Sequence, residues 1–195
     1  MKPAKSTMPV LKQIVELIPA YLVAKLSRTH GVDKQSRTFT PWSHVVSLAH
    51  AQLAHSLSLN DVCDDLRHHA GALTTLRRAT PPSRNGLSHA NRTRNADMAE
   101  ELFWVTLDHL RAEAPESGMG RNYVGFPRRF KRTINVVDST TIKLVANCMD
   151  WARHRRQKAA AKCHMRLDLQ TFLPRFALVK AANTHDASEA AALCA

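Results

Sequence analysis

The chain has 195 residues, 44% of them apolar, which is enough to bury a core in one large or two small domains. Arginine and lysine outnumber the acidic residues 28 to 16, so the net charge is +12 and the isoelectric point is near 10.1. The sequence has no apolar run close to the ~20 residues of a membrane span, and its amino terminus lacks the apolar region of a secretory signal. These features exclude a membrane partner and predict a cytoplasmic protein that binds a polyanion, with nucleic acid as the first candidate.

The positive charge is concentrated in the second part of the chain. Residues 1–117 carry 14 basic and 11 acidic side chains, whereas residues 118–195 carry 14 and 5. Ordinary solubility would explain a general excess of basic residues. Two dense clusters within residues 118–195 instead favour contact with phosphates.

The cysteines and histidines lack the spacing of a metal site. Each of the four cysteines stands singly, so we interpret them as reduced structural thiols. Five of the eleven histidines lie in helical patterns without a partner cysteine, and we expect them on helix surfaces rather than as metal ligands. They are His44, His50, His55, His68 and His69.

The first half of the chain has helical periodicity and helix-capping residues. Apolar residues recur at helical spacing between positions 10 and 26, where Pro19 predicts a kink or break. Thr40-Pro41 supplies a cap and a first-turn proline for the clearest predicted helix. Its expected buried stripe consists of Trp42, Val45, Val46, Ala49 and Leu53.

Three further helices are predicted before residue 113. Ser58-Leu-Asn-Asp61 has the pattern of a capping box, and Ser83 follows two prolines as the cap of a short polar helix. The segment Ala96–Ala112 has acidic residues near its start and basic residues near its end, which matches the helix dipole. Its expected buried face consists of Met98, Leu102, Phe103, Leu107 and Leu110.

The order of elements predicts an α+β fold with two domains. Residues 1–114 form an all-α domain, residues 115–132 form a basic linker that is rich in Gly and Pro at its start, and residues 133–195 form the second domain. The second domain opens with the strand-like segment Ile134–Leu144 and continues with two more, Ala161–Leu169 and Pro174–Ala181.

Asp138 is the candidate metal ligand of the second domain. It follows the apolar run Ile134–Val137, which we expect to be a buried strand that delivers Asp138 and the hydroxyls of Ser139 and Thr140 at its exposed end. Magnesium selects carboxylates at strand ends, and phosphoryl transfer on DNA commonly uses two such ions. A simple strand-to-turn junction also produces this pattern.

The order of these motifs resembles a known family. The helical domain, the basic linker, Val-Val-Asp138-Ser-Thr-Thr, Lys162-Cys-His164-Met-Arg-Leu-Asp168 and Asn183-Thr-His185-Asp186 together resemble insertion-sequence-4 family transposases of the Asp-Asp-Glu type. Ile18-Pro19, Trp42, Ala51-Gln52-Leu53 and Ser58-Leu-Asn-Asp61-Val look like the helical domain that precedes the catalytic core in one branch of that family.

The resemblance implies a ribonuclease-H-like core in which Asp138 is the first of three acidic ligands for Mg²⁺. The motifs that carry the second Asp and the Glu in the family do not occur in this sequence, so we expect a truncated enzyme that binds DNA but does not cut it alone. We interpret Asp186 as a helix cap and Asp168 as a solvent-facing or paired carboxylate.

The expected partners are double-stranded DNA at the terminal repeats of the element, a second copy of the chain or a full-length transposase, and the expected location is the bacterial nucleoid. A DNA-binding regulator or inhibitor of transposition without catalysis is the alternative. Ser58–His69 and Ser83–Asn95 resemble a helix-turn-helix with a long connection, and the second helix is a candidate recognition helix. Its candidate DNA-binding residues are Arg84, Asn85, His89, Asn91 and Arg92.

Two basic clusters are candidates for sequence-independent phosphate contact. They consist of Arg128, Arg129, Lys131 and Arg132, and of Arg153, Arg155, Arg156 and Lys158. A solvated face without a partner is the alternative for both clusters and for the recognition helix. Trp151, beside the second cluster, either stacks on an unpaired base or packs under the loop.

Overall fold

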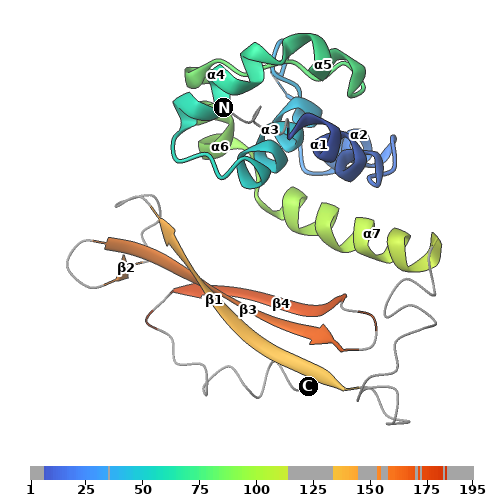
Figure 1. Cartoon of the computed structure of the whole chain (residues 1–195), viewed down its shortest axis with the longest axis vertical. Helices are drawn as coiled ribbons and strands as arrows, with labels where there is room; N and C mark the ends of the chain where they lie inside the picture. The colour runs from blue at the N-terminus through green and yellow to red at the C-terminus, as the bar shows by residue number, and fades with distance from the viewer. Residues whose placement is uncertain are drawn as a thin grey trace, which may run out of the picture. The chain divides into compact units, whose positions relative to one another are not determined.

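The computed structural model describes residues 7–34, 36–113, 134–144, 153–154, 158–169, 171, 173–181 and 183. The chain is α+β, and it divides into two compact units, Met1–Ala112 and Glu113–Ala195. The described part of the first unit is helical, and that of the second is an antiparallel sheet (Figure 1). None of the helices in the described ranges has both the length and the apolar character needed to cross a bilayer.

The first unit begins with two short helices separated at Pro19. Helix α1 spans Met8–Glu16 and α2 spans Leu22–Thr29, so the predicted break is confirmed. After α2 the chain turns at Gly31, whose φ of +64° is in the left-handed region that glycine adopts without steric cost. The amide of Val32 donates to the carbonyl of Ser27, and that of Gly31 donates to Arg28, which closes α2 with a Schellman motif.

The helices that follow begin at the predicted caps. Helix α3 spans Pro41–Leu53, and the Thr40 hydroxyl accepts from the amide of Ser43. Helix α4 spans Leu59–His68, and both hydrogen bonds of the Ser58–Asp61 capping box are present. Short helix α5, Ala70–Thr75, was not predicted, because its sequence Ala-Gly-Ala-Leu-Thr-Thr has little helical periodicity. Helices α6, Arg84–Thr93, and α7, Asp97–Glu113, complete the unit.

Helix α3 contacts α1, α2 and α4 (Figure 1). It lies between two hydrophobic clusters, since Val46 belongs to the first and Val45 packs against the second. Trp42 packs against both clusters. The fully buried face of α3 consists of Ser43, Val46, Ser47 and His50. Val46 belongs to the predicted stripe, and the other members of that stripe are partly buried against the two clusters: Trp42, Val45, Ala49 and Leu53. Periodicity misses the polar residues of this face because it counts only apolar residues. The buried hydroxyls are satisfied internally, since Ser47 donates to the carbonyl of Ser43 at 2.7 Å and the amide of Thr80 donates to the Ser43 hydroxyl at 3.0 Å.

Two side-chain predictions for the helical unit are wrong. His50 is not on a helix surface but is completely buried, with Nε2 at 3.0 Å from Asp65 Oδ2. On α7, Met98, Leu102 and Leu107 are buried as predicted, but Phe103 exposes 42% of its surface. On α1 the buried residues are Met8, Leu11 and Val15.

The described strands of the second unit form a meander. Strand β1, Asn135–Leu144, pairs antiparallel with β3, Lys158–Asp168, which pairs on its other side with β4, Pro174–Ala181. A two-residue strand β2, Arg153–His154, pairs with the start of β3. The predicted strands are therefore present, and the described part of β1 lies at an edge of the sheet.

The predicted linker 115–132 lies outside the described residues, as do Arg128, Arg129, Lys131, Arg132, Arg155, Arg156, Trp151 and Asp186. Arg153 and Lys158 are placed by their backbone only, in β2 and at the start of β3.

Candidate nucleic-acid interface

Helix α6 presents a polar face without acidic residues. Ser83 caps the helix by accepting from the amide of Gly86 at 3.1 Å, and a Cβ added to Gly86 would lie only 3.0 Å from that hydroxyl. Leu87 and Ala90 anchor the opposite face in the interior, with 2% and 4% exposure. This orientation leaves the predicted residues Arg84, Asn85, His89, Asn91 and Arg92 exposed.

The exposed face of α6 belongs to a longer segment without acids. Residues 66–96 contain no Asp or Glu. Their six arginines are Arg67, Arg77, Arg78, Arg84, Arg92 and Arg94. A solvated helix without a partner usually mixes both signs of charge, whereas one that meets phosphates or base edges excludes acids. Hydrogen-bonding groups and arginines on one anchored helix are chemically suited to a nucleic-acid duplex.

The candidate residues of α6 differ in their freedom to contact a ligand. The amide oxygen of Asn91 accepts a hydrogen bond from His44 Nε2 at 2.7 Å, which fixes the Asn91 side chain against α3. Burial lowers the pKa of His44, the bond to Asn91 opposes this, and the charge of Arg94 adds to the lowering. The fold therefore favours the neutral form of His44. Because the carboxamide oxygen of Asn91 accepts from His44, the NH₂ group of Asn91 is the group that is free of this hydrogen bond.

The α4–α6 pair is not a standard helix-turn-helix. The two helices contact each other, but residues 69–83 between them include α5 and two consecutive left-handed residues, Arg77 and Arg78, with φ of 52° and 59°. Arg77 donates to the carbonyl of Ile18 at 2.8 Å and lies over the Trp42 ring at 4.9 Å. Its interactions hold the connection in place, so Arg77 is a packing residue here and not a free cation.

A polar groove borders α6 and adds basic residues that the sequence patterns did not reveal. It has a volume of about 610 Å³ and lies between the segment after α2 and the second half of α6. Lys34 and His30 line it from the first side, and His89 and Arg94 line it from the second. Sequence reasoning missed Lys34 and Arg94 because neither belongs to a cluster of basic residues.

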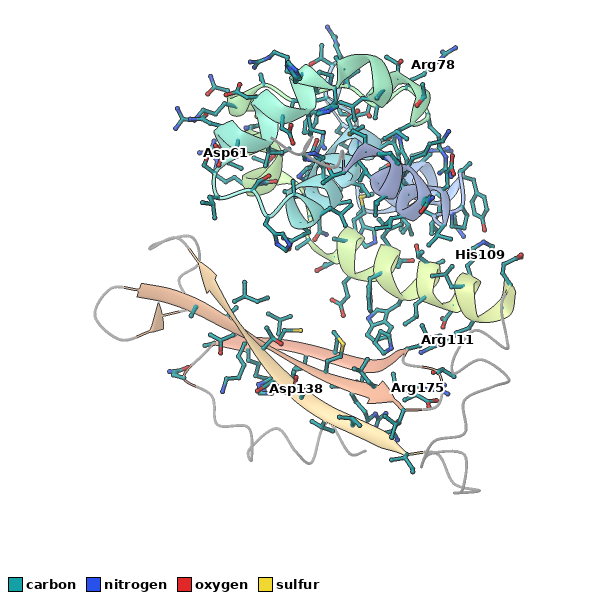
Figure 2. All side chains as sticks on the ribbon, in the orientation of Figure 1. Asp61, Arg78, His109, Arg111, Asp138 and Arg175 are labelled. Atoms are coloured by element: carbon teal, nitrogen blue, oxygen red, sulfur yellow. The ribbon has the colours of Figure 1, made fainter. Side chains whose placement is uncertain are left out.

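The carboxylate of Asp138 lies in the middle of β1, which corrects the expectation that it stands at the end of a buried strand. The strand continues to Leu144, and Val136 and Val137 expose 41% and 44% of their surfaces. Because side chains alternate along a strand, Asp138 shares its face with Thr140, whereas Ser139 points to the other face. The register adds Met165 of β3 as its cross-strand neighbour. Asp138 is exposed, and its Oδ1 accepts from the amide of Ser139 at 2.8 Å (Figure 2).

The described residues around Asp138 supply one carboxylate for a metal ion. In the ranges that the structure describes, no three His, Cys, Asp or Glu side chains come together as a metal site. Magnesium needs six oxygen ligands, so an exposed Asp138 fits the role of one ligand among several but is not a site by itself.

Asp168 is a paired structural carboxylate. It is 2% exposed, so it does not face solvent, and its Oδ2 accepts from Arg175 Nη2 at 2.7 Å and Nε at 3.2 Å. The prediction that it is paired is confirmed. The two residues close the β3–β4 hairpin, and Figure 2 labels Arg175 on β4.

Residues 6–76 match a domain of unknown function, DUF4372, which is found in transposase-like proteins. The match covers α1 to α5 and ends before α6, although α6 packs on α4 within the same helical unit. No curated protein and no solved structure shows a significant match to the chain.

Proposed function

We propose that this protein acts in DNA transposition, as part of an insertion-sequence-4 type transposase. In this proposal the helical unit binds the terminal repeat of the element, and α6 contacts the bases and phosphates of the duplex. The sheet unit begins a ribonuclease-H-like core in which Asp138 is one of the acidic ligands of Mg²⁺. Residues 6–76 support the proposal through their match to a domain of transposase-like proteins.

The observation that carries the DNA-binding part is the exposed face of α6. Arg84 and Arg92 lie on a helix that Ser83 caps and Leu87 anchors, so their positions are fixed by the fold. Guanidinium groups bind guanine edges bidentately and phosphates equally well. The acid-free segment 66–96 removes the repulsion that a carboxylate would exert on a phosphate backbone.

The support for a catalytic role of the sheet unit is the placement of Asp138. A meander that starts with an edge strand carrying an exposed Asp138 is compatible with the opening of a ribonuclease-H-like domain. Two ions cannot be held by one carboxylate, so cleavage requires further acidic ligands beside Asp138. A DNA-binding regulator without catalysis would need α6 but not Asp138, and this difference separates the two functions.

The test measures binding of the full chain to duplex DNA. A fluorescent duplex is first selected from a random pool with the parent protein, and anisotropy then gives affinity for this duplex and for a scrambled one. We expect R84A/R92A to weaken binding to the selected duplex at least about tenfold, because each lost base contact costs about 1–3 kcal/mol. Discrimination between the two duplexes should fall as well.

The controls address charge and catalysis separately. R28A removes an exposed arginine from α2 and should leave affinity nearly unchanged. D138N should bind DNA as the parent does, with or without Mg²⁺, since Asp138 is assigned to a metal and not to the duplex. Failure of the parent to bind any duplex, or equal affinity for the parent and R84A/R92A, would contradict the proposed role of α6.

A further inference from the structure

The polar groove beside α6 has the walls and the charge of an anion site. Its first wall starts at the left-handed turn of Gly31 and continues with Lys34, Ser36 and Thr38. Its second wall includes His89 of α6 and Arg94, the residue after that helix. Among the described residues that line the groove there is no aspartate or glutamate, although Glu101 pairs with His30 at its edge at 2.6 Å.

Arg94 contributes a fixed positive charge to this groove. Its guanidinium donates to the carbonyls of Phe39 and Thr40 and lies over the Phe39 ring at 5.3 Å. Burial lowers the pKa of Arg94, but its ordinary value is so high that the group stays charged at pH 7. No carboxylate among the described residues pairs with it. A partly desolvated cation whose partners are neutral attracts an anion into the groove that it lines.

Lys34 is the cation that is free to meet such an anion. Its side chain is exposed, and none of the described acidic residues forms an ion pair with it. His30 is held by Glu101, and Arg94 is held by the two carbonyls. The groove therefore combines the exposed ammonium of Lys34, the guanidinium of Arg94 and the hydroxyl of Thr38, which are groups that commonly bind phosphate oxygens. The Ser36 hydroxyl donates to the carbonyl of Asp33 at 2.6 Å and is not counted among them.

His89 connects the groove with the exposed face of α6. His89 lies both on the exposed face of α6 and in the wall of the groove, so a ligand that contacts this face of α6 is adjacent to the groove. A helix that reads base edges is flanked by the sugar-phosphate backbones, and these need cationic partners beside the helix. We infer that the groove binds the sugar-phosphate backbone of the duplex contacted by α6, with Lys34 as the main contact; this inference rests on the proposed function.

The experiment compares two lysines of the helical unit in the full chain. Lys25 of α2 is exposed like Lys34 but does not line the groove, so K25A and K25E are matched controls. Affinity for the selected and the scrambled duplex is measured between low and moderate salt. We expect K34A to reduce the slope of log affinity against log salt by about 0.9, the value for one lost phosphate contact.

K34A and K34E should weaken binding to both duplexes by the same factor, because a phosphate contact carries no sequence information. Both K25 variants should bind as the parent does. T38W fills the groove without changing its charge, and it should also weaken binding to both duplexes. Thermal unfolding of each variant verifies that the fold is intact.

The outcomes separate the groove from α6. If R84A/R92A loses discrimination while K34E binds like K25E and T38W binds like the parent, the groove inference is wrong and the role of α6 stands. If the parent binds no duplex, the proposed function fails first. Loss of discrimination in K34E, rather than uniform weakening, would contradict a backbone contact and assign Lys34 to a base.

Discussion

The helical unit and the sheet unit differ in what they bury. Among the described residues, the helical unit covers large aliphatic side chains such as Leu11, Leu26 and Leu66, each with 2% exposure or less. The described sheet buries Ala160 and Ala161, together with the polar side chains of His164 and Asp168. Aliphatic burial stabilises a fold roughly in proportion to area, whereas buried polar groups contribute only when they are paired. The described helices thus have a conventional core, and the described sheet does not.

The largest expected effect is that of a core leucine. Leu66 of α4 is completely buried, so L66A should lower the free energy of unfolding by about 2–5 kcal/mol through lost burial and the cavity that remains. L57A removes the same atoms from a residue with 97% exposure and should have almost no effect. Denaturant unfolding gives the two values, and hydrogen exchange resolved by segment shows which unit is destabilised.

A sheet variant tests the other side of this comparison. Val179 of β4 has 54% exposure, so V179A should cost far less than L66A. If V179A destabilised the protein as much as L66A, the sheet would possess a tight core of its own and the contrast between the two units would be wrong.

The features that the sequence predicted depend on residues close together in the chain. The caps at Thr40, Ser58 and Ser83 and the break at Pro19 depend on interactions within a few residues, and all four are confirmed. The bounds of β4 are those predicted from Pro174–Ala181. Local signals of this kind identify the elements but not their environment.

The unpredicted features depend on contacts between distant segments. His50 is buried because α3 lies between two clusters, and Arg94 faces a groove because residues from the segments 31–34 and 36–39 line its other side. Asp138 lies within β1 because the residues on both sides of it pair with β3. The run of hydroxyl residues after Asp138 gives no sign of this pairing. Of the candidate site, the exposed residues of α6 followed from its cap and spacing, whereas the groove required the tertiary structure.

The next expected effect is a loss of stability at acidic pH that originates in the helical unit. Burial lowers the pKa of His50, the charge of Asp65 opposes this and that of His69 reinforces it. The unfolded state therefore binds a proton near pH 6.5 that the folded state does not, so stability is greatest above that pH and falls below it. One proton limits the slope to about 1.4 kcal/mol per pH unit.

H50Q removes this titration, so the free energy of unfolding should vary less between pH 7 and pH 5. This holds even if H50Q lowers stability at pH 7. H68Q changes an exposed histidine of α4 and is the control for the substitution. Urea unfolding at a series of pH values gives the free energy of unfolding of both variants. The remaining dependence in H50Q should reflect His44, whose pKa burial also lowers; an unchanged slope would show that His50 does not titrate differently on folding.

The smallest expected effect concerns a local interaction in the helical unit. S58A removes a hydroxyl that accepts from the amide of Asp61 at 3.2 Å, so it should cost about 1 kcal/mol, the usual value for an N-cap. N60A changes an exposed residue of the same turn that makes no capping bond and should be nearly neutral. If S58A proved as neutral as N60A in urea unfolding, α4 would be held in place by Leu66 and its neighbours, and the capping box would only mark where the helix begins.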